Sequence, residues 1–260
     1  MELCIVGAGE MGRWLADAVS VEALAFADTD AAAARDAAAA FDAEAVELAD
    51  GTPAEGRTFE TVCLAVPLPI VADAVADWAP YAESAMLDVS GIMRPPVESM
   101  REHLPDRERA SLHPLFAPQR APGNVALVAD SVGPTLEPLL DSLHETGNDL
   151  FETTPAEHDE AMSTVQAKTH AAVLAWALAG EEVREEFHTP VSAGLADLAG
   201  TVTEGDARVY ADIQESFAGV DAVAAAAQEL ATADREGFAD LYAEAGAAAE
   251  ALEPSEDERG

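Results

Sequence analysis

Short apolar runs alternate with longer, helix-like stretches over residues 1–153. This alternation predicts strands joined by crossover helices, which is the signature of a mostly parallel sheet. We expect strands at 3–6, 24–27, 61–66, 85–89, 110–112, 125–129 and 150–153. We expect helices at 30–41, 70–78 and 135–146, and the alanine-rich stretch 31–40 fits a crossover helix because alanine is the best helix former.

The pattern changes at Thr154. Thr154 is a good N-cap, Pro155 suits the first helical position, and Glu157 completes a capping box. Beyond this point only helical patterns follow, which we expect at 155–179, 190–203, 207–217 and 220–251. The sequence therefore predicts an α/β domain over 1–153 with a doubly wound sheet, and an all-α domain over 154–260 whose end, 254–260, is a frayed tail.

Three glycines follow the first expected strand and open a helix. Gly7 would make the tight turn, Gly9 would let the backbone approach a pyrophosphate, and Gly12 would let the helix pack on the strand. The helix N-terminus at Glu10 and Met11 would then face the phosphates with its positive end. This context predicts a Rossmann dinucleotide-binding domain.

Asp28 ends the second expected strand, where an acid usually accepts hydrogen bonds from the adenosine ribose. Thr29 and Asp30 follow without an arginine for a 2′-phosphate, which favours NAD over NADP. Asp28 could instead be the N-cap of the next helix. Val66 and Pro67 lie where such folds approach the nicotinamide ribose, although an ordinary strand exit has the same sequence.

His113 lies at the rim of the predicted sheet, in the segment 111–118. The unperturbed pKa of histidine, about 6.5, lets this side chain accept a proton near neutral pH. A proton acceptor beside a nicotinamide would suit alcohol oxidation. The residues alone leave open a second interpretation, in which His113 only ends a strand before a turn proline.

The chain is strongly acidic. Its 260 residues hold 50 acidic and 13 basic side chains, a formal charge of −37, and Lys168 is the only lysine. Because the acids are spread along the chain, we favour adaptation to high salt, as in halophilic archaea, over a surface that binds a basic partner. Nucleic-acid binding is excluded, since little here could neutralise phosphates.

No apolar run is long enough for a membrane span, and the start lacks the basic region of a secretory signal. We therefore expect a cytoplasmic protein that does not bind membranes. Cys4 and Cys63 lie in apolar strand-like runs and are interpreted as buried apolar residues, so we expect neither a disulfide nor a metal site.

With the glycine pattern in place, three further segments carry a family resemblance. The first is 112–118, with His113-Pro114; the second is 157–162 followed by 165–170; the third is 209–213. Together they resemble the prephenate/arogenate dehydrogenase family over most of the chain. The resemblance implies NAD-dependent oxidation of prephenate, in which a ring alcohol gives up a hydride, a histidine takes the hydroxyl proton, and loss of CO₂ yields 4-hydroxyphenylpyruvate in tyrosine biosynthesis.

The resemblance also implies site residues. His113 would be the proton acceptor in its neutral form, and His170 would contact the substrate side chain. Gln166 lies one helical turn before His170, so both could point into one cleft. His158 and Asp159 are expected to be structural. By the same resemblance, the helical domain would form a homodimer, which suits its long apolar-faced helices.

The chain departs from the family pattern at three positions. Gly91 stands where the family has the serine that hydrogen-bonds the catalytic histidine, and neighbouring Ser90 is the expected substitute. Met93 replaces a lysine, and Thr201 replaces the arginine that clamps the ring carboxylate. Arg208 is our first choice as a replacement cation, ahead of the other candidates Lys168, Arg94 and Arg120.

Other functions stay open at this stage. Arogenate, in which an amino group replaces the keto group, would suit a site with one cation fewer. Reductases of the 6-phosphogluconate or pyrroline-carboxylate type have the same domain plan but lack the His-Pro segment. A regulatory protein that binds the dinucleotide without catalysis is a non-enzyme alternative, which the departures at Gly91, Met93 and Thr201 support.

Overall fold

The computed structural model describes residues 1–252, and the predicted tail at 254–260 lies outside them. The strands are β1 (Glu2–Val6), β2 (Ala23–Ala27), β3 (Glu44–Ala45), β4 (Leu48–Ala49), β5 (Thr52–Pro53), β6 (Phe59–Leu64), β7 (Ala82–Asp88), β8 (Glu108–Pro114), β9 (Asn124–Ser131) and β10 (Asp149–Glu152). The seven predicted strands all form, with ends shifted by a few residues.

The α-helices are α1 (Glu10–Ala18), α2 (Ala31–Ala40), α3 (Val71–Trp78), α4 (Arg94–His103), α5 (Glu137–Glu145), α6 (Pro155–Met162), α7 (Thr169–Ala179), α8 (Pro190–Thr203), α9 (Ala207–Ser216), α10 (Val220–Thr232) and α11 (Arg235–Leu252). Short 3₁₀ turns lie at η1 (Ala54–Gly56), η2 (Leu68–Ile70), η3 (Ala79–Tyr81), η4 (Pro118–Arg120) and η6 (Glu185–Phe187), and a π-helical segment, η5, spans Ser163–Lys168.

Eight strands form one sheet in the order β10-β9-β8-β7-β6-β1-β2-β3. All neighbouring strands in it pair in parallel except β8 and β9, which are antiparallel. The chain runs outward from β1 through β2 to β3 and then outward on the other side from β6, so the strand order reverses between β1 and β6. Ligands of open α/β sheets bind at the carboxyl ends of strands beside such a reversal.

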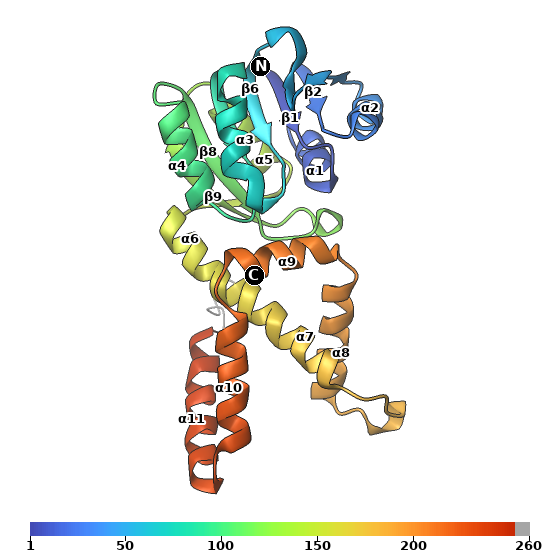
Figure 1. The fold of residues 1–260 in the computed structure, drawn as a ribbon, viewed down its shortest axis with the longest axis vertical. Coiled ribbons are helices and arrows are strands. Elements are labelled where there is room, and N and C mark those ends of the chain that lie inside the picture. Colours follow the sequence, from blue (N-terminus) through green and yellow to red (C-terminus); the bar gives the residue numbers. More distant parts are fainter. Residues whose placement is uncertain (253–260) are drawn as a thin grey trace. The chain divides into compact units, whose positions relative to one another are not determined.

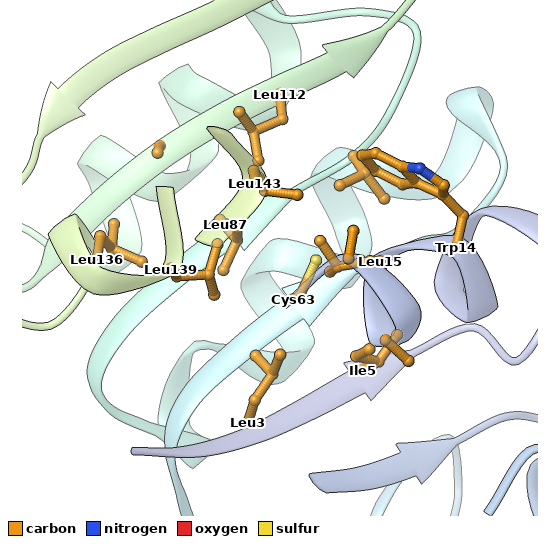
Figure 2. Packing of buried hydrophobic residues seen from close by; sticks show 14 of the residues in the cluster. Leu3, Ile5, Trp14, Leu15, Cys63, Leu87, Leu112, Leu136, Leu139 and Leu143 are labelled. Atoms are coloured by element: carbon orange, nitrogen blue, oxygen red, sulfur yellow. The ribbon is translucent and has the colours of Figure 1, made fainter. Parts of the chain in front are cut away.

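Helices cover both faces of this sheet (Figure 1). One face packs against α1 and α5 through a core that includes Leu15, Leu139 and Leu143, and Figure 2 shows this cluster. The other face packs against α3 and α4 through Val75, Val97 and Met100. Burying an aliphatic side chain contributes about 1.5–3 kcal/mol, so these cores hold the strand ends in place. The predicted Rossmann-type α/β domain followed by helices is confirmed.

Two helix predictions are wrong in detail. The stretch 220–251 is two helices rather than one, because Asp234 ends the first segment and caps the next, accepting a hydrogen bond from the Gly237 amide at 2.9 Å. The stretch 155–179 is not a continuous α-helix, since the π-helical segment η5 interrupts it. A π turn closes with i→i+5 hydrogen bonds, which changes the phase of the residues that follow.

The chain forms two compact units. One comprises Met1–Gln166 with Gly205–Phe217, and the other comprises Ala167–Glu204 with the described residues from Ala218 onward. The first unit holds the sheet, α6 and α9, and α9 packs there against η2. The second unit pairs α7 with both α8 and α10. The boundary near residue 153 stays a prediction.

Candidate active site

The glycine-rich turn has a shape that only glycine can give at two positions. Gly7, directly after β1, has φ +108°, and a Cβ there would lie 2.1 Å from the carbonyl oxygen of Ala65. A Cβ at Gly12 would lie 2.0 Å from the carbonyl oxygen of Gly7. A Cβ at Gly9 would meet nothing within 4 Å. The turn thus leaves open space in front of the α1 N-terminus, which is a cradle suited to a pyrophosphate.

Asp28 lies at the carboxyl end of β2 and is tied to this turn. Its Oδ2 accepts a hydrogen bond from the Ala8 amide at 2.8 Å, and its Oδ1 accepts one from the Asp30 amide at 2.8 Å. Asp30 is the N-cap of α2, where it accepts from the Ala32 amide at 2.8 Å. The alternative that Asp28 caps this helix is therefore wrong, and the remaining lone pairs of Asp28 are available to hydroxyl donors.

The other predicted cofactor residues lie along the same edge. Glu10 and Met11 begin α1, and Val66 and Pro67 follow β6 and lead into η2. The loop after β8 reaches the first of these pairs: Gln119 Nε2 donates to Glu10 Oε1 at 3.2 Å. The neighbouring rings of Phe116 and Trp14 meet edge to face, with centroids 5.5 Å apart. The segment after His113 therefore packs over the start of α1.

His113 lies on β8 and contacts a second histidine. The side chain is 7% exposed. Its Nδ1 lies 2.8 Å from Nε2 of His158, on α6, and the two rings are inclined at 73°. Burial first, and the neighbouring His158 second, lower the pKa of His113 to about 3. His113 is thus neutral at physiological pH, which is the form that can accept a proton.

Asp159 orders this pair from the other side. Its Oδ1 lies 2.8 Å from Nδ1 of His158, and its carboxylate accepts hydrogen bonds from the Met93 and Arg94 amides at 3.0 and 3.1 Å. Burial alone would raise the pKa of Asp159, but the hydrogen bonds from His158 and these two amides outweigh it and lower the pKa. The carboxylate is therefore ionised, and it occupies the positive N-terminus of α4.

The Nε2 atom of His113 faces Gln166 and Gly91. Gln166 Nε2 lies 3.4 Å from it, and a Cβ built on Gly91 would lie at the same distance. Leu68, in η2, closes this side at 3.5 Å from that Cβ position. Oε1 of Gln166 is buried and has no hydrogen-bond partner within residues 1–252. A ligand placed against His113 would thus meet a free acceptor as well.

Ser90 makes other contacts. Its hydroxyl lies 2.5 Å from Oδ1 of Asp88 and 2.7 Å from the Ile92 carbonyl oxygen, and no hydrogen bond among the described residues joins it to His113. Burial raises the pKa of Asp88 to about 7 against the hydrogen bonds from Ser90. Met93 is fully buried in the apolar core. The Ser90 and Met93 side chains therefore fix the loop between β7 and α4.

The expected substrate-binding residues are divided between the two units. Gln166 lies with His113 in the first unit, whereas His170, on α7, belongs to the second. Since η5 runs between them, the one-turn spacing of an α-helix does not apply. Arg208 is the second residue of α9, in the first unit. It is exposed, and its Nε lies 4.0 Å from Oδ2 of Asp206.

The remaining cation candidates have different surroundings. Arg94 is the first residue of α4 and Arg120 the last of η4; both are exposed. Among the described residues, with the Glu55 side chain left aside, neither guanidinium has a hydrogen bond or ion pair. Lys168 ends the π-helical segment, and Thr201 lies on α8.

His158 and Asp159 are the site residues that the sequence left in a structural role. A histidine and an aspartate next to each other near a helix start were visible in the sequence, but their contact with a residue 45 positions away was not. Within residues 1–252, no group of three or more histidine, cysteine, aspartate or glutamate side chains could hold a metal ion. None of the helices there is long and apolar enough to cross a membrane.

Known proteins resemble this chain in sequence. No protein-family model matches it. It is 32% identical over 206 residues to a 4-amino-4-deoxyprephenate dehydrogenase from Streptomyces pristinaespiralis, covering 71% of this chain and 69% of that protein. It is 22% identical over 225 residues to a probable arogenate/prephenate dehydrogenase from Methanocaldococcus jannaschii, covering 77% of this chain and only 50% of that protein.

Solved structures share the fold. A prephenate dehydrogenase from A. aeolicus, in complex with hydroxyphenyl propionate and NAD⁺, matches with a TM-score of 0.68 at 16% identity, over 95% of this chain and 96% of that one. A Synechocystis arogenate dehydrogenase matches with a TM-score of 0.61 at 16% identity, over 93% of this chain and 95% of that one.

Proposed function

The chain belongs to the family of prephenate and arogenate dehydrogenases, and we propose that it oxidises prephenate with NAD⁺ to 4-hydroxyphenylpyruvate and CO₂. One observation carries the proposal. His113 is buried and neutral, its Nδ1 is engaged by His158, and its Nε2 faces the side where Gln166 offers a free acceptor. A base held in this way at the carboxyl edge of a Rossmann sheet suits removal of a hydroxyl proton.

The cradle described above fits NAD⁺. Gly7, Gly9 and Gly12 shape the turn, and the amides of Glu10 and Met11 at the start of α1 would meet the pyrophosphate. Asp28 would accept hydrogen bonds from the adenosine ribose, and Val66 and Pro67 would flank the nicotinamide ribose. When bound, NAD⁺ supplies the acceptor for the hydride.

His113 would hold the hydroxyl proton only for the duration of the reaction. The ring carbon that carries the hydroxyl loses a hydride, and the hydroxyl proton goes to Nε2 of His113. Loss of CO₂ leaves the electron pair of the broken C–C bond in the ring, which becomes aromatic with a phenolate oxygen. That oxygen takes the proton back, so His113 returns to its neutral state without net proton release.

Substrate binding would use Gln166, His170 and Arg208. Oε1 of Gln166 is the buried acceptor beside His113, and the resemblance to the family assigns His170 to the substrate side chain. Arg208 is the proposed cation for a carboxylate, with Arg94 and Arg120 of the same unit as the further candidates. We also propose Ser90 as the hydroxyl next to the catalytic centre, acting through the loop that it ties to Asp88.

Two related substrates compete with prephenate. Arogenate adds an ammonium group, which an acidic chain with few cations would accommodate. 4-Amino-4-deoxyprephenate carries an amine in place of the ring hydroxyl. The Streptomyces relative is named for it, and Gly91 itself places no side chain against Nε2 of His113. Formation of NADH by the purified protein with each of the three compounds tests the proposal and ranks the substrates.

A non-catalytic role is the remaining alternative. If the protein binds NAD⁺ tightly but reduces none of it with any of the three compounds, a regulatory protein that binds the dinucleotide is favoured and the dehydrogenase proposal is wrong. If the protein oxidises one of these compounds and substitution of His113 abolishes that activity, the dehydrogenase proposal is supported.

We also infer the setting in which the protein acts. The second unit exposes large apolar side chains, among them Leu178 at 88%, Val191 at 75% and Tyr242 at 73%, which supports a homodimer through this unit. The charge of −37 supports a cytoplasm of high salt, where screening weakens repulsion. The size of the particle in solution, measured by light scattering in concentrated KCl, tests the dimer.

A further inference from the structure

Three side chains form a continuous hydrogen-bonded line that ends at the proposed base. His113 on β8 meets His158 on α6, and His158 meets Asp159, each across 2.8 Å. Both histidines are buried, with 7% and 3% of their surface exposed. Water therefore has little access to the Nδ1 atom of His113, and any proton that leaves this atom must pass to His158.

The direction of each hydrogen bond follows from Asp159. As an ionised carboxylate it can only accept, so Nδ1 of His158 carries a proton and donates it. A neutral His158 then has its lone pair on Nε2, and Nδ1 of His113 must donate to it. Nε2 of His113 is consequently left as an acceptor, which agrees with the nearby amide nitrogen of Gln166 at 3.4 Å.

We propose that the proton taken up at Nε2 of His113 is relayed through His113 to His158, so that the positive charge of the reaction lies on His158 beside Asp159. This inference rests on the proposed dehydrogenase function. The substrate O–H bond breaks and an Nε2–H bond forms on His113, while the Nδ1–H bond of His113 breaks and an Nε2–H bond forms on His158. The reverse shift returns the proton to the phenolate oxygen, and no proton is gained or lost.

The surroundings favour the charge on His158 over His113. A charged His113 would be buried without a carboxylate in direct contact, whereas a charged His158 would share a hydrogen bond with Asp159. The Asp159 carboxylate is itself fixed by the amides that begin α4. Asp88, at the end of β7, is a further titratable group near this line, and the charge of Asp159 helps to raise its pKa.

Nitrogen NMR of the full chain, labelled with ¹⁵N-histidine and saturated with NADH, tests the relay without turnover. We expect His113 and His158 each to carry a proton on Nδ1 at about pH 8, with Nε2 of His113 left as the acceptor. Assignment uses the His113→Asn and His158→Gln variants. A His113 with its proton on Nε2 would overturn the proposal.

The His158→Gln variant gives an independent kinetic test. A glutamine oxygen can still accept from Nδ1 of His113, but it cannot take up a proton. We expect kcat to fall by about 10²-fold, with KM and the affinity for NADH changed by less than about twofold. The matched control is His144→Gln, at an exposed histidine in the last turn of α5, which should leave kcat unchanged.

The outcomes separate the relay from the proposed function. A fall in kcat of less than about tenfold in His158→Gln means that His158 only positions His113, and the relay is wrong. If this variant does not fold, the nitrogen of His113 that carries the proton in the unsubstituted protein decides. If the protein oxidises none of the three compounds, the dehydrogenase proposal fails, while the NMR experiment still shows which nitrogen of His113 carries the proton.

Discussion

The Ala8 amide donates a hydrogen bond of 2.8 Å to Asp28 and so joins the glycine-rich turn to the end of β2. Asp28→Asn keeps an oxygen for this bond but removes the charge that would bind ribose hydroxyls. We expect the affinity for NADH to fall by about tenfold, since a hydrogen bond to a charged group contributes about 1.5–3 kcal/mol. Titration of the protein fluorescence with NADH measures this. Asp30→Asn is the control, because asparagine is as good an N-cap for α2 as aspartate, and this variant should bind NADH normally. Equal losses of NADH affinity in both variants would contradict the role of Asp28.

Substitution of Gly12 should lower the stability of the protein, whereas substitution of Gly9 should weaken NADH binding. Gly12→Ala places a Cβ 2.0 Å from the carbonyl oxygen of Gly7, so we expect a clear fall in the melting temperature. Gly9→Ala meets no protein atom within 4 Å and should fold normally, but the methyl group fills the space proposed for the pyrophosphate and should weaken NADH binding. Thermal unfolding and NADH titration of both variants test this contrast. Normal NADH affinity in Gly9→Ala would argue against the cradle.

His113→Asn should separate binding from chemistry. Asparagine cannot accept the hydroxyl proton as a base, so we expect kcat to fall by about 10²–10⁴-fold. The affinity for NADH should stay unchanged, because the proposed dinucleotide contacts lie on other residues. Stopped-flow absorbance of NADH measures the rate, and His103→Asn, at an exposed histidine of α4, is the control. Retention of more than about a tenth of the activity would exclude His113 as the base.

The buried Asp88 predicts a specific dependence of stability on pH. Its pKa is about 7 in the folded state against 3.8 as the reference value. Between these two pH values the folded state binds a proton at Asp88 more readily than the unfolded state does. The stability that this proton contributes is present at low pH and is lost as the pH rises through about 7. Asp88→Asn lacks this titration and keeps an acceptor for Ser90.

Denaturant unfolding at about pH 5 and pH 8 measures the effect. The unsubstituted protein should lose stability relative to Asp88→Asn over this interval, while the exposed Asp77→Asn of α3 should follow the unsubstituted protein. A constant difference between the Asp88 variant and the unsubstituted protein at both pH values would mean that Asp88 does not titrate there.

Removal of salt should unfold the protein. A formal charge of −37 on 260 residues repels itself strongly when the Debye length grows from about 3 Å at 1 M salt to about 30 Å at 0.01 M. We expect helical circular dichroism to be lost on dialysis from concentrated KCl to dilute buffer. A full helical signal at low salt would count against adaptation to a saline cytoplasm.

The sequence predicted the parts of the site that depend on neighbouring residues. Gly7, Gly9 and Gly12 follow a strand and precede a helix, so their turn could be predicted from one short segment. His113 was placed at the carboxyl end of a strand because the short apolar run before it predicted β8. Ser90 shows the limit: its hydroxyl was expected to take the place of the family serine that hydrogen-bonds the catalytic histidine, and it donates to the Asp88 carboxylate two residues earlier in the chain.

The contacts between distant segments could not be predicted in this way. The bond from His113 to His158 depends on how α6 packs, and periodicity gives the existence of a helix but not its neighbour. The break at Asp234 did have a local signal, because an aspartate can cap a new helix, but the alanine-rich pattern around it predicted a single helix. The π-helical segment had no such signal, and it changed the relation of Gln166 to His170.

The Asp159 carboxylate accepts hydrogen bonds from the amides that begin α4 and also contacts His158. It therefore contributes both to the folding of α4 and to the orientation of the two histidines. In a survey of random variants, substitutions there would reduce the amount of protein and its turnover together, and a screen for activity alone would record a catalytic position. Conversely, adding stability elsewhere would restore the yield of an Asp159 variant but not its rate. This position would therefore change slowly as related sequences diverge, whatever substrate each of them comes to use.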